Sequence, residues 1–485
     1  MNRPGLIIIA LLCFFSCSKN TQQTDPALIP DVSKPINLNL TIDQKNPGLV
    51  IPKTFEGLSY EVEILTQNPD FLNEQNSAVV QLFKNLGPGV LRFGGNTSDR
   101  IPWTGNSRTI TNGVNSLNTT DIDRVAKFTT ATGWPVIFGL NLGANDPKSA
   151  AEEAKYIAAT LKGNLNALQM GNEPDYYMFD KLRKSNYGYA DFIGEWKSYY
   201  SAINSVSPRL PFAGPDVGYN TGWIEALANN ERGILRLIDQ HYYAYSQAVK
   251  PNVAYNDILI KDQGLDKYFQ VLHDISKRVN LPYRITECNS VSYGGKVGVS
   301  DVFASALWGL DFMWQAAQNN CAGVNFHTGI KTDQHYTAIT IDNGSLTARP
   351  LYYGMLAFRY ATNSNASIVP TVIDNNTYNC NAYACVQADG SYAITIINKE
   401  VSKNFSVNVQ LSKSASTISI ARLTAPLVTS ATGVRFANSQ VNTDGTFKPN
   451  ITEQFVINKD TFTINIPASS AAVIKVQTAS NTSVQ

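Results

Sequence analysis

Two glutamates each follow a short apolar run, in positions where a carboxylate can serve as an acid, a base or a nucleophile. Glu173 lies in the stretch GNEPD, directly after residues 168–170. Glu287 follows residues 283–286 in the same way. Such runs are typical of strands buried on both faces of a parallel sheet, and Pro174 would end the first strand because proline has no N–H to donate. Two carboxylates at strand ends indicate acid/base and nucleophilic chemistry on a glycosidic bond.

Strand and helix patterns alternate along the middle of the chain, which predicts that a barrel holds both glutamates. The strand-like runs are residues 55–60, 90–96, 135–142, 168–170, 210–216, 237–243, 283–286 and 323–327. One helix is expected to begin with Asp146 as its N-cap and Pro147 at its first position, and to end before Gly163. Another is expected to begin at Ser300. Eight strands over about 280 residues fit an α/β fold of the (β/α)₈ TIM barrel type, which we place at residues 46–362.

Polar side chains stand at the ends of the predicted strands. They are Asn96, Asn141, Asn172, Glu173, Asp216, His241, Glu287 and His327. Barrel enzymes build their active sites at the carboxyl ends of their strands, so we expect these groups to meet at one face. Arg92, from a neighbouring strand, could hold the carboxylate of Glu287 ionised.

After the barrel the helical period disappears and short alternating runs take its place. This pattern predicts an accessory antiparallel β-sandwich over residues 363–478. A strand at residues 36–45 has the same alternation before the barrel begins, and we expect it to complete the sandwich. Residues 479–485 are expected to be a polar tail.

The N-terminus has the features of a targeting signal. A positive start and a short apolar core predict a lipoprotein-type signal peptide at residues 1–17, with Cys17 as the lipidated first residue of the mature chain. A plain secretory signal is the alternative. Residues 18–35 are interpreted as a linker. We therefore expect the protein in the bacterial periplasm, or at the outer membrane or cell surface, held to the membrane only by its lipid anchor.

Composition narrows the choice of partners. The formal net charge is +1, so no bulk field favours nucleic acid. No Cys/His cluster has the spacing of a metal site, and we expect neither a metal nor another cofactor. Cys380 and Cys385 could form a disulfide in an oxidising compartment, while Cys288 and Cys321 are interpreted as inert buried thiols. We expect a monomer that binds a glycan or glucuronide substrate.

The sequence resembles glycoside hydrolase family 79, the β-glucuronidase and heparanase family of the retaining (β/α)₈ clan. The matching stretches are residues 91–96, 171–175, 287–301, 304–310, 323–329 and 350–355. A β-sandwich made of an N-terminal strand and the C-terminal region is also that family's arrangement. The chain departs from the family pattern at Thr328, where a second glycine is expected.

The resemblance implies roles for individual residues. Glu173 would be the acid/base and Glu287 the nucleophile. Asn172 would contact the sugar 2-hydroxyl, and the backbone N–H groups around Tyr293-Gly294-Gly295 would bind the glucuronate carboxylate. The other residues expected to bind substrate are Tyr336, His327, Tyr243, Tyr219 and Asn96.

Plainer interpretations stay open at this point. The two glycines could simply make a tight turn, and His327, Tyr219 and Tyr243 could be core residues. The favoured activity is that of a retaining exo-β-glucuronidase, or a 4-O-methylglucuronidase, working by double displacement. An endo-β-glucuronidase of the heparanase kind and a lipoprotein that binds glycans without cleaving them are the alternatives.

Overall fold

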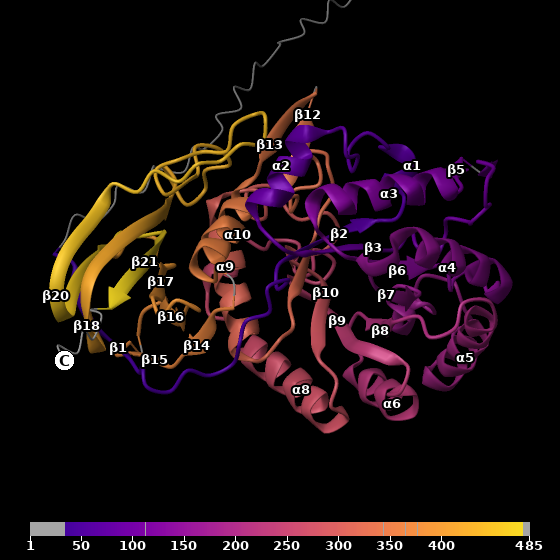
Figure 1. Ribbon diagram of the computed structural model, residues 1–485, viewed down its shortest axis with the longest axis horizontal. Helices are drawn as coiled ribbons and strands as arrows, with labels where there is room; N and C mark the ends of the chain where they lie inside the picture. The colour runs from indigo at the N-terminus through magenta and orange to yellow at the C-terminus, as the bar shows by residue number, and fades with distance from the viewer. Residues whose placement is uncertain (1–33, 112, 343, 364, 376, 479–485) are drawn as a thin grey trace, which may run out of the picture.

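Eight parallel strands close into a barrel in the computed structural model, which describes residues 34–111, 113–342, 344–363, 365–375 and 377–478 (Figure 1). In barrel order the strands are β2 (Gly57–Glu61), β3 (Val90–Gly94), β6 (Val136–Leu140), β7 (Leu165–Met170), β8 (Phe212–Val217), β9 (Leu235–Tyr245), β10 (Tyr283–Val291) and β11 (Val324–His327). Each of the eight predicted runs overlaps one of these strands. The expected TIM barrel is confirmed.

Side chains in the barrel change from apolar to polar within one step along the strands. Val90 and Leu237 belong to one small apolar cluster. Two residues further on, on the same face of the same strands, stand the buried polar side chains Arg92 and Asp239. The strands therefore place an apolar layer directly beneath a charged one at their carboxyl ends.

Helices surround the barrel and separate it from the β domain (Figure 1). They are α1 (Ile64–Gln67), α2 (Ser77–Asn85), α3 (Thr119–Thr132), α4 (Pro147–Leu161), α5 (Tyr189–Val206), α6 (Thr221–Glu231), α7 (Tyr255–Leu259), α8 (Gln263–Val279), α9 (Phe303–Gln318) and α10 (Pro350–Ala361), with 3₁₀ turns η1 (Lys162–Asn164) and η2 (Pro174–Tyr176). None of the described helices is long and apolar enough to cross a bilayer.

The two predicted helix starts had different outcomes. Asp146 caps α4 as expected, since its side chain accepts the N–H of Ser149 at 3.0 Å. The helix expected at Ser300 begins only at Phe303. Ser300 is instead occupied in a turn, where its hydroxyl lies 2.9 Å from the hydroxyl of Ser290 and accepts the N–H of Lys296.

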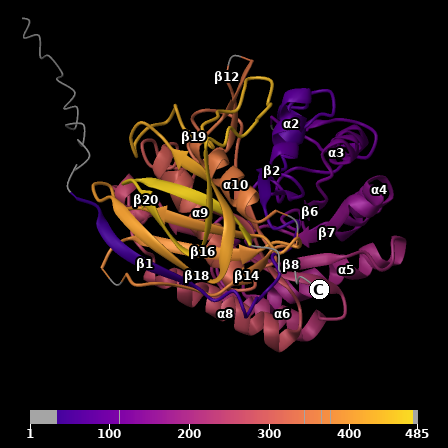
Figure 2. The same cartoon turned by 60° about the vertical axis from the view of Figure 1, so that its left-hand side comes forward.

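The β domain is a nine-stranded sheet around its own apolar core. Its strands are β1 (Ile36–Ile42), β14 (Ser367–Val369), β15 (Thr371–Ile373), β16 (Cys380–Val386), β17 (Tyr392–Asn398), β18 (Phe405–Thr424), β19 (Arg435–Phe436), β20 (Glu453–Ile466) and β21 (Ser470–Thr478). Strand β1 lies along β18 and pairs with it in parallel, so the sheet is mixed and not purely antiparallel (Figure 2). The hairpins β4 (Ile110–Thr111) with β5 (Val114–Asn115) and β12 (Ile339–Asp342) with β13 (Ser345–Ala348) stand apart.

Cys380 and Cys385 do not form the disulfide that their spacing allowed. Both lie on β16 as buried free thiols. Five residues along one strand place two side chains on opposite faces, which keeps these sulfur atoms apart. Cys288 and Cys321 are also buried and free.

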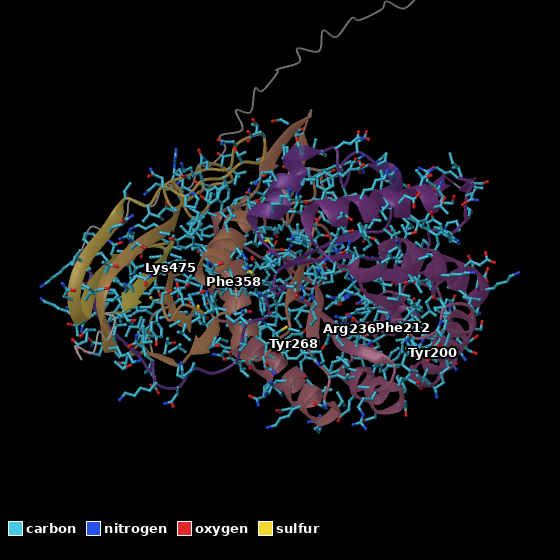
Figure 3. All side chains as sticks on the ribbon, in the orientation of Figure 1. Tyr200, Phe212, Arg236, Tyr268, Phe358 and Lys475 are labelled. Carbon is cyan, nitrogen blue, oxygen red and sulfur yellow. The ribbon has the colours of Figure 1, made fainter. Side chains whose placement is uncertain are left out.

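Two helices join the domains by close packing and one buried charge. Trp314 of α9 stacks on Tyr383 of β16 with ring centroids 5.4 Å apart. Phe358 of α10, which is labelled in Figure 3, packs edge-on against Trp314 at 5.1 Å. Asp311 of α9 accepts hydrogen bonds from Lys399 at 2.7 Å and from the Tyr383 hydroxyl at 2.6 Å, both in the β domain. The β domain is thus fixed to the side of the barrel. The predicted signal peptide with Cys17, most of the predicted linker and the predicted tail lie outside the described residues.

Candidate active site

Arg92 of β3 is the fully buried centre of the polar layer at the carboxyl ends of the strands. Its guanidinium donates hydrogen bonds of 2.6–2.9 Å to Ser59, Gln169, Asn172, Asp216 and Glu287. A buried cation is tolerated only where partners replace its lost hydration, and here every arm of the guanidinium is engaged. The expected contact between Arg92 and Glu287 is present at 2.8 Å.

Glu287 of β10 is held as a carboxylate by its surroundings. Oε2 accepts from Arg92, and Oε1 accepts the hydroxyl of Tyr243 at 2.8 Å. Nδ1 of His327 lies 3.3 Å from Oε2. Burial by itself raises the pKa of Glu287, but the positive charges of His327, His241 and Arg92 outweigh it and hold this pKa well below its ordinary value.

Glu173 has the opposite setting. It follows β7 in the left-handed conformation, with φ of 48°, and its N–H donates to the carbonyl of Asp216 at 2.8 Å. Burial raises the pKa of Glu173, against the opposing hydrogen bond from His241, and the charge of Glu287 raises it further. Two neighbouring carboxyl groups whose pKa values are pushed apart can serve as a proton donor and a nucleophile.

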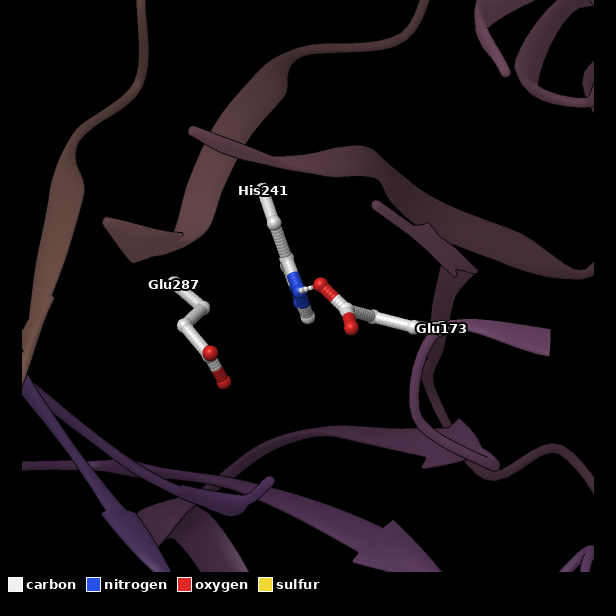
Figure 4. A group of neighbouring side chains, drawn as sticks. All are labelled: Glu173, His241 and Glu287. Carbon is white, nitrogen blue, oxygen red and sulfur yellow. Dashed lines mark hydrogen bonds and ion pairs between the residues drawn. The ribbon is translucent and has the colours of Figure 1, made fainter. Parts of the chain in front are cut away.

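The two glutamates face each other across a short gap. One carboxylate oxygen of Glu173, one of Glu287 and a ring nitrogen of His241 all lie within 4.8 Å of one another (Figure 4). Retaining glycosidases hold their carboxyl groups about 5–5.5 Å apart, whereas inverting enzymes hold them about 6.5–9.5 Å apart. The three groups would also suit a divalent cation by ligand type, but the nearby guanidinium of Arg92 and the raised pKa of Glu173 both oppose cation binding.

His241 of β9 links the two halves of the site. Its Nδ1 lies 2.9 Å from Oε1 of Glu173 and its Nε2 lies 2.9 Å from Oδ1 of Asp216, which also pairs with Arg92. Burial alone lowers the pKa of His241, but Asp216 and Glu287 raise it well above its ordinary value. Sequence reasoning placed His241 and Asp216 at strand ends without roles. The spacing of His241 and Tyr243 on one face of one strand was the available signal.

Three of the predicted substrate-binding residues surround Glu287. Tyr243 and His327 contact its carboxylate, as described above. The ring of Tyr336 lies 5.8 Å from that of His327 and 6.5 Å from that of Tyr243. Tyr336 is on the loop after β11. Its ring, with those of Tyr243 and His327, forms one wall of the site beside Glu287.

Asn172 and Asn96 lie together beside the carboxylate of Glu61. The amide of Asn172 donates to Oδ1 of Asn96 at 3.3 Å, and its own Oδ1 accepts from Arg92. The N–H of Asn96 points to Oε1 of Glu61 at 3.3 Å, and Glu61 lies 3.7 Å from Nε2 of His327. Glu61 was missed by the sequence analysis, because it stands at the end of the first barrel strand without a distinctive motif.

The Tyr293-Gly294-Gly295 loop is tightly wound and fixed to Tyr336. All three residues have positive φ, of 57°, 84° and 77°. The N–H of Tyr336 donates to the carbonyl of Gly294 at 3.3 Å, and a Cβ on Gly295 would lie 2.5 Å from that same nitrogen. Within the described residues the backbone N–H groups of this loop have no protein acceptor. They are therefore available to an anion.

Tyr219 is not part of the wall around Glu287. It is half exposed on the loop after β8, and its ring packs on that of Tyr176 at 4.9 Å. The structure therefore gathers around one gap Glu173, Glu287, Asn172, Asn96, Tyr243, His327 and Tyr336. The glycine loop is hydrogen-bonded to Tyr336, and Tyr219 packs on Tyr176.

Comparison with known proteins supports a glucuronidase-type glycoside hydrolase. Residues 382–473 match a family model described as the glycosyl hydrolase family 79 C-terminal beta domain. A β-glucuronidase of Aspergillus niger is 25% identical over 379 residues, which cover 68% of this chain and 69% of that protein. A β-glucuronidase of Neurospora crassa is 23% identical over 390 residues, covering 68% and 67%.

Solved structures share the fold. A 4-O-α-L-rhamnosyl-β-D-glucuronidase of Fusarium oxysporum superposes with a TM-score of 0.75 at 19% identity, over 90% of this chain and 100% of that one. A family 51 arabinofuranosidase of Xanthomonas axonopodis pv. citri superposes with a TM-score of 0.68 at 16% identity, over 91% and 100%. Both likenesses concern the arrangement of the barrel and the accessory sheet.

Proposed function

We propose that this chain, a glucuronidase-type glycosidase similar to members of glycoside hydrolase family 79, is a retaining exo-β-glucuronidase. The observation that carries the proposal is the relation of Glu173 to Glu287. Their carboxyl groups approach within 4.8 Å, and their pKa values move in opposite directions. A retaining reaction needs this spacing and this division between a protonated and an ionised carboxyl group.

The proposed reaction has two displacements. The Glu287 carboxylate attacks the anomeric carbon, the glycosidic C–O bond breaks, and Glu173 gives its proton to the departing oxygen. A water molecule then attacks the same carbon, Glu173 takes the water's proton, and the bond between the sugar and Glu287 breaks. Glucuronate with its original β-configuration leaves, and both carboxyl groups return to their starting states.

The glycine loop supports glucuronate as the sugar. The N–H groups of Tyr293, Gly294 and Gly295 have no acceptor among the residues that the structure describes, and three amides in a tight curve are a good receptor for a carboxylate. Asn172, held by Arg92 and Asn96, is the candidate for the sugar 2-hydroxyl. The net charge of +1 suits a short glycan end better than a long polyanion.

Azide rescue tests the mechanism with a different product for each glutamate. On an activated aryl β-glucuronide, Glu287→Ala with azide should give the α-glucuronyl azide, whereas Glu173→Ala with azide should give the β-anomer. Aryl glycosides of galactose, glucose and xylose, offered to the wild type, control for the sugar. Faster turnover of a neutral glycoside, or an α-configured first product from the wild type, would contradict the proposal. Internal cleavage of a glucuronide polymer would indicate endo action instead.

A further inference from the structure

Aromatic side chains are exposed next to Glu173, on the loops that follow β7 and β8. Tyr176 packs on Tyr219 at 4.9 Å and on Phe179 at 6.1 Å between ring centroids. Phe179 is 62% exposed and Tyr219 is 50% exposed. Exposed rings are uncommon in the described part of the chain, where the others of comparable exposure are Tyr293 in the glycine loop and Phe455 on β20. We call the group Tyr176, Phe179 and Tyr219 the aromatic platform.

The platform is held in place by the residue that follows the Asn-Glu-Pro motif. The buried carboxylate of Asp175 accepts the backbone N–H groups of Gly218 at 3.0 Å, Tyr219 at 3.0 Å and Asn220 at 2.9 Å. These hydrogen bonds fix the loop after β8 to the turn η2, and with it Tyr219 to Tyr176. Rings fixed before binding lose little conformational entropy when a ligand stacks on them.

The platform also directly adjoins the acid/base carboxyl group. A Cβ on Gly218 would lie 2.2 Å from the ring of Tyr176 and 3.0 Å from Oε1 of Glu173, so only a glycine fits between them. Whatever group lies on Tyr176 is therefore next to the carboxyl group of Glu173. In a glycosidase the proton of the acid/base carboxyl group goes to the oxygen of the leaving group.

We propose that Tyr176, Phe179 and Tyr219 bind the sugar ring of the leaving group, an inference that rests on the proposed function. The C–H face of a pyranose ring would stack on the aromatic faces, while its hydroxyls stay hydrated at the open surface. Tyrosine hydroxyls beside the rings would accept or donate hydrogen bonds to that sugar. A neutral sugar fits the platform because its three side chains carry no charge.

The kinetic test compares two donors that share the glucuronyl group. One is a disaccharide with glucuronate β-linked to a neutral sugar, and the other is β-glucuronyl fluoride, whose leaving group has no ring. In Phe179→Ala and Tyr219→Ala, the ratio of kcat/KM on the disaccharide to kcat/KM on the fluoride should fall about three- to tenfold for each lost ring. Phe455→Ala, which removes a comparably exposed ring on β20, should leave the ratio unchanged. An unchanged ratio in both platform variants overturns the inference.

A binding measurement separates this inference from the proposed function. The disaccharide is titrated calorimetrically into Glu287→Ala and into the double variant Glu287→Ala/Phe179→Ala. We expect the Kd to rise three- to tenfold in the double variant. Absence of turnover by the wild type would count against the proposed function alone. Equal Kd values, or no binding by Glu287→Ala, would overturn the platform. So would a dimer of the wild type that Phe179→Ala dissociates without changing the Kd, because the rings would then serve self-association.

Discussion

His241 and Glu173 are joined by a hydrogen bond of 2.9 Å between Nδ1 and Oε1, and the far side of the imidazole is held by Asp216. The carboxylates of Asp216 and Glu287 raise the pKa of His241, which favours the charged ring with Nδ1 donating to Glu173. The proton of Glu173 then belongs on its other oxygen, where a substrate can receive it. His241 is in this way a positioning residue for the acid/base.

Replacing His241 should therefore change the pH profile of the reaction. Burial raises the pKa of Glu173 and His241 opposes that rise, so the neutral side chain of His241→Gln lets this pKa rise further. The alkaline limb of kcat/KM should move to higher pH, and kcat should fall about ten- to a hundredfold at neutral pH. His273→Gln on α8 is the matched control. A lower kcat with an unmoved alkaline limb would mean that His241 serves only the packing of the site.

Arg92 supports the stability of the site as well as its chemistry. Arg92→Met leaves Asp216 and Glu287 buried without their cation, which should cost about 3–5 kcal/mol in the free energy of unfolding. Urea denaturation measures this loss. Arg278→Met removes an exposed arginine paired with Glu225 and should change stability little. Similar losses in both variants would contradict the central place given to Arg92.

The same substitution has a pH-dependent consequence. The folded state holds the pKa of Glu287 below its ordinary value of 4.5, so this carboxylate stabilises the fold above pH 4.5 and less as the pH falls through the folded pKa. Arg92→Met should weaken this dependence and move the acid limb of kcat/KM to higher pH. A pH series of unfolding curves and rates on both proteins measures the two effects. An acid limb that does not move would assign the low pKa to the two histidines alone.

Two glycines of one loop offer a matched test of carboxylate binding. A Cβ on Gly295 would strike the backbone of Tyr336, whereas a Cβ on Gly298 would meet nothing within 4 Å, although both have φ above 70°. Gly295→Ala should raise the KM for aryl glucuronide about tenfold or more, and Gly298→Ala much less, since losing charge-assisted hydrogen bonds costs about 1.5–3 kcal/mol. Equal effects of the two substitutions would indicate that backbone strain, and not the placement of the amides, matters.

The joint between the domains should depend on a single cation. Lys399 is buried against Asp311 at 2.7 Å, and Lys399→Met leaves that carboxylate without its positive partner. We expect a loss of about 3–5 kcal/mol in the free energy of unfolding. Lys184→Met, which removes an exposed lysine paired with Asp191, is the control and should change stability little. Differential scanning calorimetry would show whether the two domains then unfold separately.

The barrel and its two glutamates could be predicted from sequence because local patterns carry that information. Buried parallel strands are mostly apolar, and a polar residue after such a run marks its carboxyl end. The contact between Arg92 and Glu287 could be predicted in the same way, because each residue's place in the site follows from its position on a strand. These features need only the order of the strands.

Other features depend on contacts between distant segments and leave no local trace. The bridge from Glu173 through His241 to Asp216 needs the relative rotation of three strands. The parallel pairing of β1 with β18 looks the same in sequence as an antiparallel one. Serine is a common helix N-cap, but the side chain of Ser300 instead binds the hydroxyl of Ser290 and the backbone N–H of Lys296. The position of Tyr219 on Tyr176 follows from Asp175, which holds the loop of Tyr219 by three hydrogen bonds.

The pairing of β1 with β18 has a consequence for biogenesis. During synthesis β1 emerges before the barrel, but its partner residues Phe405–Leu411 emerge after the barrel is complete. Until then β1 is an unpaired edge of the kind that recruits other chains, and closing so long a loop carries an entropic cost. The fraction of newly made protein that escapes aggregation should therefore depend on how β1 is protected before β18 is made. A chaperone could shield β1 in the nascent chain, or fast folding of the barrel could hold β1 near the place where β18 emerges.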